Sequence, residues 1–278
     1  MVAIIKSMFN KINFVNVQEF RQRLISTIAL IILFISLLFI GNPFLTIFFS
    51  LLFSLIIIEY EKLTATLSKS LQLCKTLLLQ IILLSFTIFE IFEYDISLMF
   101  FNNLFFFLSI SILINLIFFL YKKTDSIKII LSTLIIFSFF ALISILQKSN
   151  GLNLFLYVVI LVSTMDIFAY LGGKLLGKIK IMPNISKGKT IEGTVIGLFA
   201  TVILSILFKD LINYNLKYSL IFGFMIGILA FFGDLVESSF KRTIGVKDSG
   251  KLIPGHGGLM DRFDGYFLTL PFSYFFIN

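Results

Sequence analysis

Residues 238–265 read SSFKRTIGVKDSGKLIPGHGGLMDRFDG. This segment holds five Lys or Arg residues, three Asp residues, five glycines before its last residue and the only histidine of the chain. It lies between two apolar runs, in a chain of 278 residues that is 58% hydrophobic and only 14% charged. Ionisable groups gathered beside apolar runs are costly unless they serve a purpose, so we expect the chemistry of the protein here.

The composition excludes an ordinary soluble domain. The mean hydropathy is +1.03, and the chain has 36 Phe and no Trp, whereas soluble domains are only about half apolar. Apolar runs long enough to cross a hydrocarbon core of about 30 Å recur along the chain. The sequence therefore predicts an all-α, polytopic integral membrane protein with about nine transmembrane helices, at about 24–41, 43–59, 75–93, 97–121, 127–146, 151–171, 191–208, 217–238 and 263–278.

The basic residues predict an orientation. Lys and Arg are retained on the cytoplasmic side of a membrane, and a cytoplasmic N-terminus places 20 of the 23 cations inside. Only Lys148, Lys209 and Lys217 then fall outside. We expect a protein of the cytoplasmic (inner) membrane whose segment 238–265 faces the cytoplasm.

The net charge of +8 does not indicate a nucleic-acid partner, because the cations lie in membrane-flanking loops and form no soluble basic domain. The lipid bilayer with its anionic headgroups is the better partner. The single Cys74 has no second cysteine with which to form an internal disulfide.

We interpret the chain, residues 1–278, as a single membrane domain. Residues 1–150 form a helical scaffold rich in Phe, Ile and Leu, with its few acids, such as Glu59 and Glu61, at or near span ends. Residues 151–278 carry most of the glycines and polar residues inside spans. They are predicted to be the catalytic half, with two cytoplasmic active-site loops.

Four polar residues near the end of the eighth span are predicted to share one helical face. Asp234, Glu237, Ser238 and Lys241 follow the spacing i, i+3, i+4, i+7. Such a stripe suits a bound cation and a phosphate. The alternative is that Asp234 and Lys241 are interfacial residues whose side chains reach out to water.

Asp261 and Asp264 repeat the i, i+3 spacing at the start of the last span. Two carboxylates one turn apart suit Mg²⁺, which binds through one or two carboxylates together with substrate phosphates. With Asp234, they are predicted to converge on one or two metal ions. The alternative role for acids in a first turn is to complement the helix dipole.

The glycine-rich run Pro254–Gly258 is predicted to present backbone N–H groups to phosphate oxygens. Basic residues surround it on both sides. We expect His256 to bind phosphate or position the loop and not to transfer a proton, because a phosphate monoester is already largely dianionic at neutral pH.

The order of these elements carries a resemblance. Ser-x-Phe-Lys-Arg242, Lys247-Asp248, Pro254-Gly-His-Gly-Gly258 and Asp261-Arg-Phe-Asp264 closely resemble the signature of the phosphatidate cytidylyltransferase (CDP-diacylglycerol synthase) family. A second region, from Asp166 to Tyr170 and from Ser186 to Gly193, resembles the family's Asp-x-x-Ala-Tyr run and its Ser-Pro-x-Lys-Thr-x-Glu-Gly run. Lys187 stands where the family usually has proline, so the local turn is expected to differ.

The resemblance implies transfer of the cytidylyl group of CTP to phosphatidic acid, with Mg²⁺ at Asp234, Asp261 and Asp264 and room for a second, different cation. It implies catalytic roles for Asp234, Ser238, Lys241, Asp261 and Asp264. The residues implied in substrate binding are Asp166, Ser186, Lys189, Thr190, Glu192, Glu237, Arg242, Lys247, Asp248, His256, Gly257, Gly258 and Arg262.

Other interpretations stay open on the residues alone. A CTP-dependent lipid kinase, or a cytidylyltransferase acting on another lipid phosphate, would share the metal and the basic loops. Buried acids also occur at the coupling-ion sites of transporters, but there they come with matching broken helices in two repeated halves. The loop before residue 191 has an ordinary alternative as a basic loop in which Glu192 caps the next helix. The oligomeric state is open, a homodimer included.

Overall fold

The computed structural model describes residues 28, 32–64, 69–91, 110–114, 117, 126–250, 252 and 257–277. These residues are almost entirely helical, as the sequence predicts. The helices are α3 (Phe44–Leu63), α4 (Lys69–Ile91), α6 (Ser126–Leu146), α7 (Gly151–Leu176), α8 (Ile191–Leu207), α9 (Leu216–Thr243), α10 (Met260–Phe263) and α11 (Tyr266–Ile277), with a short 3₁₀ helix at Lys209–Leu211.

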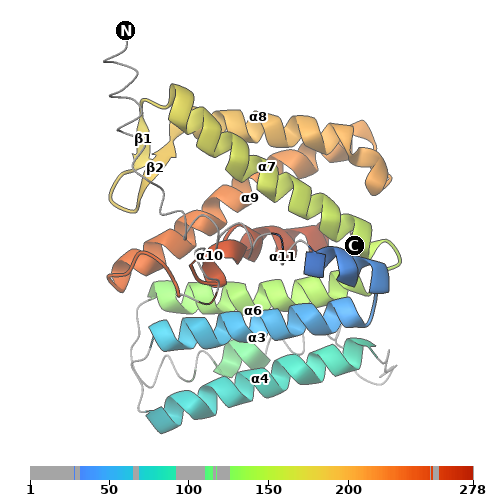
Figure 1. Ribbon diagram of the computed structural model, residues 1–278, viewed down its shortest axis with the longest axis vertical. Helices are drawn as coiled ribbons and strands as arrows, with labels where there is room; N and C mark the ends of the chain where they lie inside the picture. The colour runs from blue at the N-terminus through green and yellow to red at the C-terminus, as the bar shows by residue number, and fades with distance from the viewer. Residues whose placement is uncertain are drawn as a thin grey trace.

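The helices stack in layers (Figure 1). In one layer α3 lies between α4 and α6 and packs on both. On the far side, α7 and α8 pack against each other along much of their length, and α8 also packs on α9. Between these two groups lie α9 and the pair α10–α11, with α11 packed against α6. The catalytic half predicted from the sequence therefore rests on α3 and α6 of the first half.

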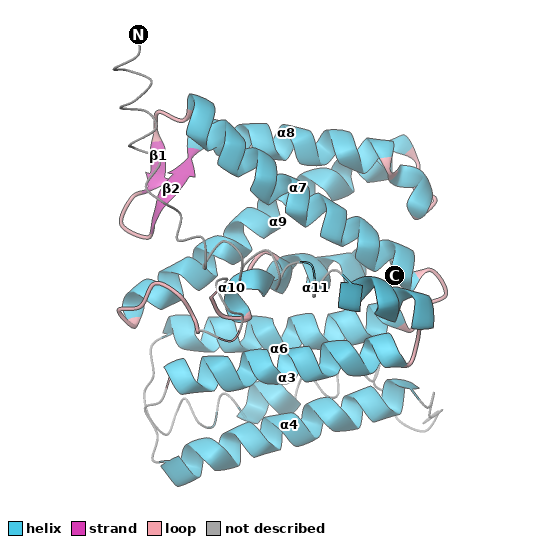
Figure 2. Cartoon of the chain, viewed as in Figure 1, coloured by secondary structure: helices cyan, strands magenta, loops and turns pink. Residues whose placement is uncertain are grey.

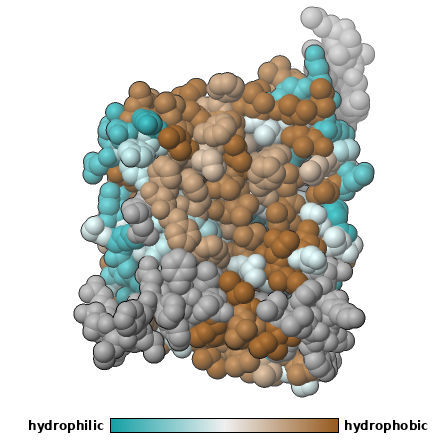
Figure 3. Space-filling model, turned by 180° about the vertical axis from the view of Figure 1, so that it is seen from behind, coloured by the Kyte–Doolittle hydropathy of each residue, from teal (hydrophilic) through white to brown (hydrophobic). Residues whose placement is uncertain are grey.

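Among the described residues, five helices are long and apolar enough to cross a membrane: α3, α4, α6, α7 and α9. The surface in Figure 3 shows a hydrophobic band between hydrophilic residues at its two lateral edges. Helix α8 has 17 residues and α11 has 12, so α11 is only about 18 Å long at 1.5 Å per residue. Large parts of the predicted spans 24–41 and 97–121 lie outside the described residues, so the count of nine stays a prediction.

Small residues let α8 approach its neighbours closely. The buried residues of α8 are Gly193, Gly197, Thr201 and Ser205, which recur every fourth position and therefore form one face. A Cβ atom on Gly193 would lie 2.5 Å from the backbone O of Ala169 in α7. Within a membrane, helix association depends on such close packing, because lipid tails are as apolar as the side chains.

A chain of hydrogen bonds joins α7, α8 and α9 at the end of α8 that is opposite Gly193. The Tyr157 hydroxyl of α7 donates to the backbone O of Ser205 in α8, at 2.8 Å, and the Ser205 Oγ donates to the backbone O of Ser219 in α9, at 2.6 Å. All three residues are buried. Buried polar groups need such partners, so this chain sets the register of α7, α8 and α9.

A β-hairpin adds to the predicted all-α fold (Figure 2). Strands β1 (Lys180–Met182) and β2 (Ser186–Thr190) are antiparallel and join the end of α7 to the start of α8. The N–H of Ile185 donates to the O of Met182 across the turn, at 3.1 Å, and Pro183 occupies the second turn position, where its fixed φ is favourable. Strand β2 of the hairpin contains Ser186, Lys189 and Thr190, three residues that the sequence analysis predicted to bind substrate.

The close approach of α7 and α8 makes Gly193 intolerant of a side chain. We expect Gly193→Ala to lower the free energy of unfolding by about 1–3 kcal/mol, because the new methyl group overlaps backbone atoms that have no rotamer to change. Thermal unfolding in detergent measures the loss. Gly227→Ala is the matched control, since the atom nearest to its Cβ would be the flexible end of Leu198, at 3.3 Å, and the next would be at an ordinary contact distance of 3.6 Å. Equal stability of the two variants would contradict this account of the packing.

Candidate active site

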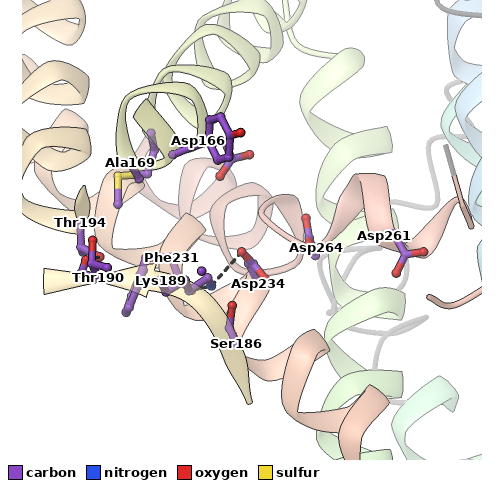
Figure 4. Close-up of a pocket in the computed structure, with 13 residues that line it drawn as sticks. Asp166, Ala169, Ser186, Lys189, Thr190, Thr194, Phe231, Asp234, Asp261 and Asp264 are labelled. Carbon is purple, nitrogen blue, oxygen red and sulfur yellow. Dashed lines mark hydrogen bonds and ion pairs between the residues drawn. The ribbon is translucent and has the colours of Figure 1, made fainter. Parts of the chain in front are cut away.

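One cavity of about 310 Å³ brings together the two regions that the sequence analysis singled out. Its walls come from α7, β2, the start of α8, α9 and the α10–α11 segment (Figure 4). The residues that line it are Met165, Asp166, Ala169, Tyr170, Ser186, Gly188, Lys189, Thr190, Thr194, Phe231, Asp234, Asp261 and Asp264. Segments about 70 residues apart in sequence thus face a single space.

Lys189 links the hairpin to α9 across this cavity. Its Nζ lies 2.7 Å from Oδ2 of Asp234 and 4.8 Å from the centre of the Phe231 ring. The other carboxylate oxygen of Asp234, Oδ1, accepts a hydrogen bond from Ser238 at 3.0 Å. The predicted shared face of Asp234 and Ser238 is confirmed, and Figure 4 shows Lys189 directed at Asp234.

Lys241 joins α9 to α10. Its Nζ lies 2.6 Å from Oε2 of Glu237, one turn back on α9, and 2.7 Å from Oδ1 of Asp261. The Glu237 side chain is fully buried, and the other two are about 10% exposed. A buried charge needs a partner of opposite sign. The ammonium of Lys241 is therefore shared by two carboxylates.

Asp261 also organises the loop that leads to it. Its carboxylate accepts hydrogen bonds from the N–H groups of Ser249, at 2.9 Å, and Gly258, at 3.0 Å. Burial raises the pKa of Asp261, but the hydrogen bonds from Lys241, Ser249 and Gly258 outweigh that effect and hold the pKa below its ordinary value. Asp261 is ionised at neutral pH.

Glu59 of α3 reaches the same loop, a contact that the sequence analysis did not single out. Its Oε1 accepts from the Ser249 hydroxyl at 3.1 Å, and its Oε2 accepts from the N–H of Met260 at 3.0 Å. Glu59 is 5% exposed. The sequence analysis assigned Glu59 to the helical scaffold, near a span end, because nothing local in the sequence points to partners 190 and 201 residues away.

A second cavity of about 680 Å³ adjoins the first. Ser186 and Gly188 line both, and the second is completed by Asn184, Ile185, Arg242 and Lys247. The guanidinium of Arg242 donates to the backbone O of Ile185 at 3.1 Å, which ties the end of α9 to the hairpin. We call the first cavity, which four Asp side chains line, the inner cavity, and the second, which Arg242 and Lys247 line, the outer cavity.

Other predicted residues have contacts of their own. Glu192 does not cap α8: Thr190 does, accepting from the N–H of Gly193 at 3.2 Å, while Glu192 accepts from the N–H groups of Lys178 and Ile179 at the start of the hairpin. Glu192 is not among the residues that line either cavity.

The remaining predicted residues belong to the signature segment. Gly257 has φ +88, a conformation that favours glycine, and the N–H of Gly258 is already donated to Asp261. Asp248 and Arg262 are exposed and line neither cavity. His256 lies outside the described residues.

The carboxylates suit a divalent cation in their chemistry. Asp166, Asp234, Asp261 and Asp264 line the inner cavity, where Lys189 is the only cation among the lining residues, so the cavity holds an excess of hard anionic oxygens. Within the described residues, however, no three acidic, His or Cys side chains stand close enough to hold one ion. Asp234, Asp261 and Asp264 thus line the same cavity, as predicted, but they do not form a three-carboxylate site for one ion.

Comparison with known proteins decides the family. A family described as "Cytidylyltransferase family" matches residues 21–278. This chain belongs to the cytidylyltransferase family. Among curated relatives, the phosphatidate cytidylyltransferase of Staphylococcus aureus (strain COL) is 46% identical over 127 residues, which are 45% of this chain and 48% of that protein.

Further relatives match a similar length. The phosphatidate cytidylyltransferase of Staphylococcus haemolyticus (strain JCSC1435) is 44% identical over 126 residues, 45% of this chain and 48% of that protein. The uncharacterized protein YnbB of Escherichia coli (strain K12) is 45% identical over 130 residues, 46% of this chain and 44% of that protein. The matched part of this chain thus spans about half the length of each relative.

Lys241, which is shared by Glu237 and Asp261, is expected to contribute to the stability of the protein. Lys241→Met leaves Glu237 buried without its cation, and we expect the free energy of unfolding in detergent to fall by about 3–5 kcal/mol. Adding Glu237→Gln removes the buried charge and should restore most of that loss. Arg242→Met, at the exposed neighbouring position, is the control and should cost much less. A Lys241→Met variant as stable as the parent would show that the ion pairs carry no net stability.

Proposed function

We propose that this protein transfers the cytidylyl group of CTP to phosphatidate, giving CDP-diacylglycerol and pyrophosphate. The observation that supports this most is the single cavity formed by residues 166–194 and 231–264, because these two regions carry the resemblance to the family. Membership of the cytidylyltransferase family and the names of the Staphylococcus relatives agree with it.

In the proposed reaction, a phosphate oxygen of phosphatidate attacks the α-phosphorus of CTP. A new P–O bond forms as the bond between the α-phosphorus and its bridging oxygen to the β-phosphorus breaks, and pyrophosphate leaves with that bond's electron pair. Phosphatidate is largely dianionic at neutral pH, so this step needs no general base. The protein's task is to position two anions and to stabilise the charge between them.

The charges of the inner cavity support a requirement for Mg²⁺. Asp166 and Asp264 form no ion pair within the described part of the chain, whereas Asp234 and Asp261 each have a lysine. We propose that the ion binds through one or two of the carboxylates of Asp234, Asp261 and Asp264 together with phosphate oxygens of the substrate. When bound, Mg²⁺ offsets negative charge on phosphate oxygens. Lys189 and Lys241 place two further cations beside the cavity, where they stabilise charge that develops on equatorial oxygens.

Labelled CTP separates this proposal from a lipid kinase. Protein purified in detergent is given phosphatidate or diacylglycerol, Mg²⁺, and CTP labelled at either the α- or the γ-phosphorus. The proposed activity puts the α-label into lipid with phosphatidate as acceptor and leaves the γ-label in pyrophosphate. Lipid that carries the γ-label would instead establish a CTP-dependent kinase, and no lipid label with any acceptor would refute both.

Asp264→Asn is the clearest test of the proposed metal ligands. Asp264 Oδ1 accepts from the N–H of Gly265 at 2.8 Å, a bond that the amide oxygen of Asn can keep, so we expect the fold to survive. Loss of the charge should reduce kcat by a factor of about 10² or more. Asp210→Asn, at an exposed position outside both cavities, is the control. Near-normal turnover of Asp264→Asn at limiting Mg²⁺ would exclude Asp264 as a ligand.

We further propose that the hairpin faces the cytoplasm and that three crossings follow it. A topology reporter inserted near Lys187 should then lie inside, one at Lys209 outside, and one fused after Asn278 outside, as the distribution of basic residues requires. Accessibility of each reporter to an impermeant reagent in intact cells measures this. Reporters at Lys187 and Asn278 on the same side would refute the order of spans.

A further inference from the structure

Three consecutive residues at the end of α3 contact three different parts of the protein. Glu59 bonds to the loop before α10, Tyr60 stacks on Phe240 of α9 with ring centres 5.4 Å apart, and Glu61 pairs with Lys75 of α4 at 2.8 Å. Successive residues of a helix point about 100° apart, which explains how neighbours in sequence reach such separate partners. Glu59 and Tyr60 both contact the segment 238–265, which carries the family signature, but of the three only Glu59 contacts residues of the loop between α9 and α10.

Both oxygens of Glu59 are used. Ser249 donates to one and Met260 to the other, so the carboxylate joins the two ends of the loop that separates α9 from α10. The loop is built close around it. A Cβ atom on Gly250 or on Gly258 would lie 1.8 Å or 2.0 Å from the Oε1 of Glu59. Glycine at these two positions makes room for the carboxylate of a distant helix.

Asp261 holds the same loop from the other side. Its carboxylate accepts from the N–H of Ser249 and the N–H of Gly258. Ser249 is therefore bound by Asp261 through its backbone and by Glu59 through its hydroxyl. Residues 258–260 are held in the same two-sided way. The two carboxylates fix Ser249 and residues 258–260, and with them the direction in which α10 carries Asp261 and Asp264 into the cavity.

We propose that Glu59 is a positioning residue for the reaction: by accepting hydrogen bonds from Ser249 and Met260, it fixes the loop that presents Asp261 and Asp264 to the cavity. This inference rests on the proposed function for its effect on turnover. Its effect on the loop does not depend on that function. The role requires a hydrogen bond to Ser249 and another to Met260 from the end of the side chain at position 59, and it does not require a negative charge there.

That distinction defines the variants. Glu59→Ala removes both acceptors. Glu59→Gln keeps both contacts, because the amide oxygen can accept from the N–H of Met260 while the amide NH₂ donates to the Ser249 hydroxyl, which is able to accept. The matched control is Glu61→Gln combined with Lys75→Met. It neutralises both members of a similarly buried ion pair, in which Glu61 lies two residues after Glu59 on α3 and Lys75 lies on α4.

Two measurements are made on each variant in detergent. Hydrogen–deuterium exchange of peptides that contain Ser249 and Met260 reports on the loop, and steady-state kinetics with CTP and phosphatidate report on turnover. For Glu59→Ala, we expect faster exchange in these peptides and a fall in kcat of about 10- to 100-fold, with a smaller change in the KM for CTP, because small misplacements of reacting groups cost rate. Glu59→Gln and the control should resemble the parent in both.

Each other outcome overturns the proposal. Unchanged exchange or unchanged kcat in Glu59→Ala would show that the loop or the reaction does not depend on Glu59. Equal damage from Glu59→Gln would show that the charge is needed, as for a residue that acts on the metal or the substrate directly. If Glu59→Ala does not fold, Ser249→Ala removes one of the two contacts and should give the same changes in smaller degree; no change in exchange there would also contradict the proposal.

The two proposals fail in different ways. Parent protein that makes no cytidylyl lipid refutes the proposed function but leaves the exchange measurement valid. Parent protein that makes it, together with a Glu59→Ala variant that exchanges and turns over like the parent, refutes the positioning role alone.

Discussion

Because the Glu237 side chain is fully shut off from water within α9, its charge must be balanced inside the protein, and Lys241 one turn further along provides the cation. That ammonium also contacts Asp261 at 2.7 Å, which ties α10 to α9. Asp261 in turn holds Ser249 and Gly258. Glu237 thus fixes Lys241, Lys241 fixes Asp261, and Asp261 fixes the loop residues that it binds.

The opposite wall of the cavity depends on the packing of α8. The small residues of α8 let its start pack so closely on α7 that a Cβ atom on Gly193 would lie 2.5–2.8 Å from backbone atoms of Ala169 and Gly173. The same contact places the hairpin that precedes α8. Lys189 can then reach Asp234 from β2. A bulkier helix face would move the hairpin outward and break this ion pair, so the close packing of α7 and α8 is a condition for the charge arrangement of the site.

Local patterns predicted what lies within one helix. The spacing of Asp234, Ser238, Glu237 and Lys241 indicated one face, and the contacts on α9 confirm it, because helical periodicity is independent of the rest of the chain. Contacts between distant segments were not predictable in the same way. Glu59 was assigned to the helical scaffold, and the hairpin was expected to be a loop. Glu192 was predicted to bind substrate, with a helix cap as the alternative, whereas it accepts from the N–H groups of Lys178 and Ile179. In each case the deciding partner is a backbone group whose position only the folded chain defines.

The acids of this site divide by what they contact. Glu59 and Glu237 never reach the cavity, and their oxygens are used by the loop and by Lys241. Asp261 serves both sides, since it lines the cavity and anchors the loop. Asp166 and Asp264 line the cavity with no ion pair within the described residues. Carboxylates without counter-cations repel phosphates at short range. A nucleoside triphosphate would therefore bind in this cavity only together with cations. The lysines are already shared with Asp234, Glu237 and Asp261, so under the proposed function the remaining balance would come from ions that enter with the nucleotide.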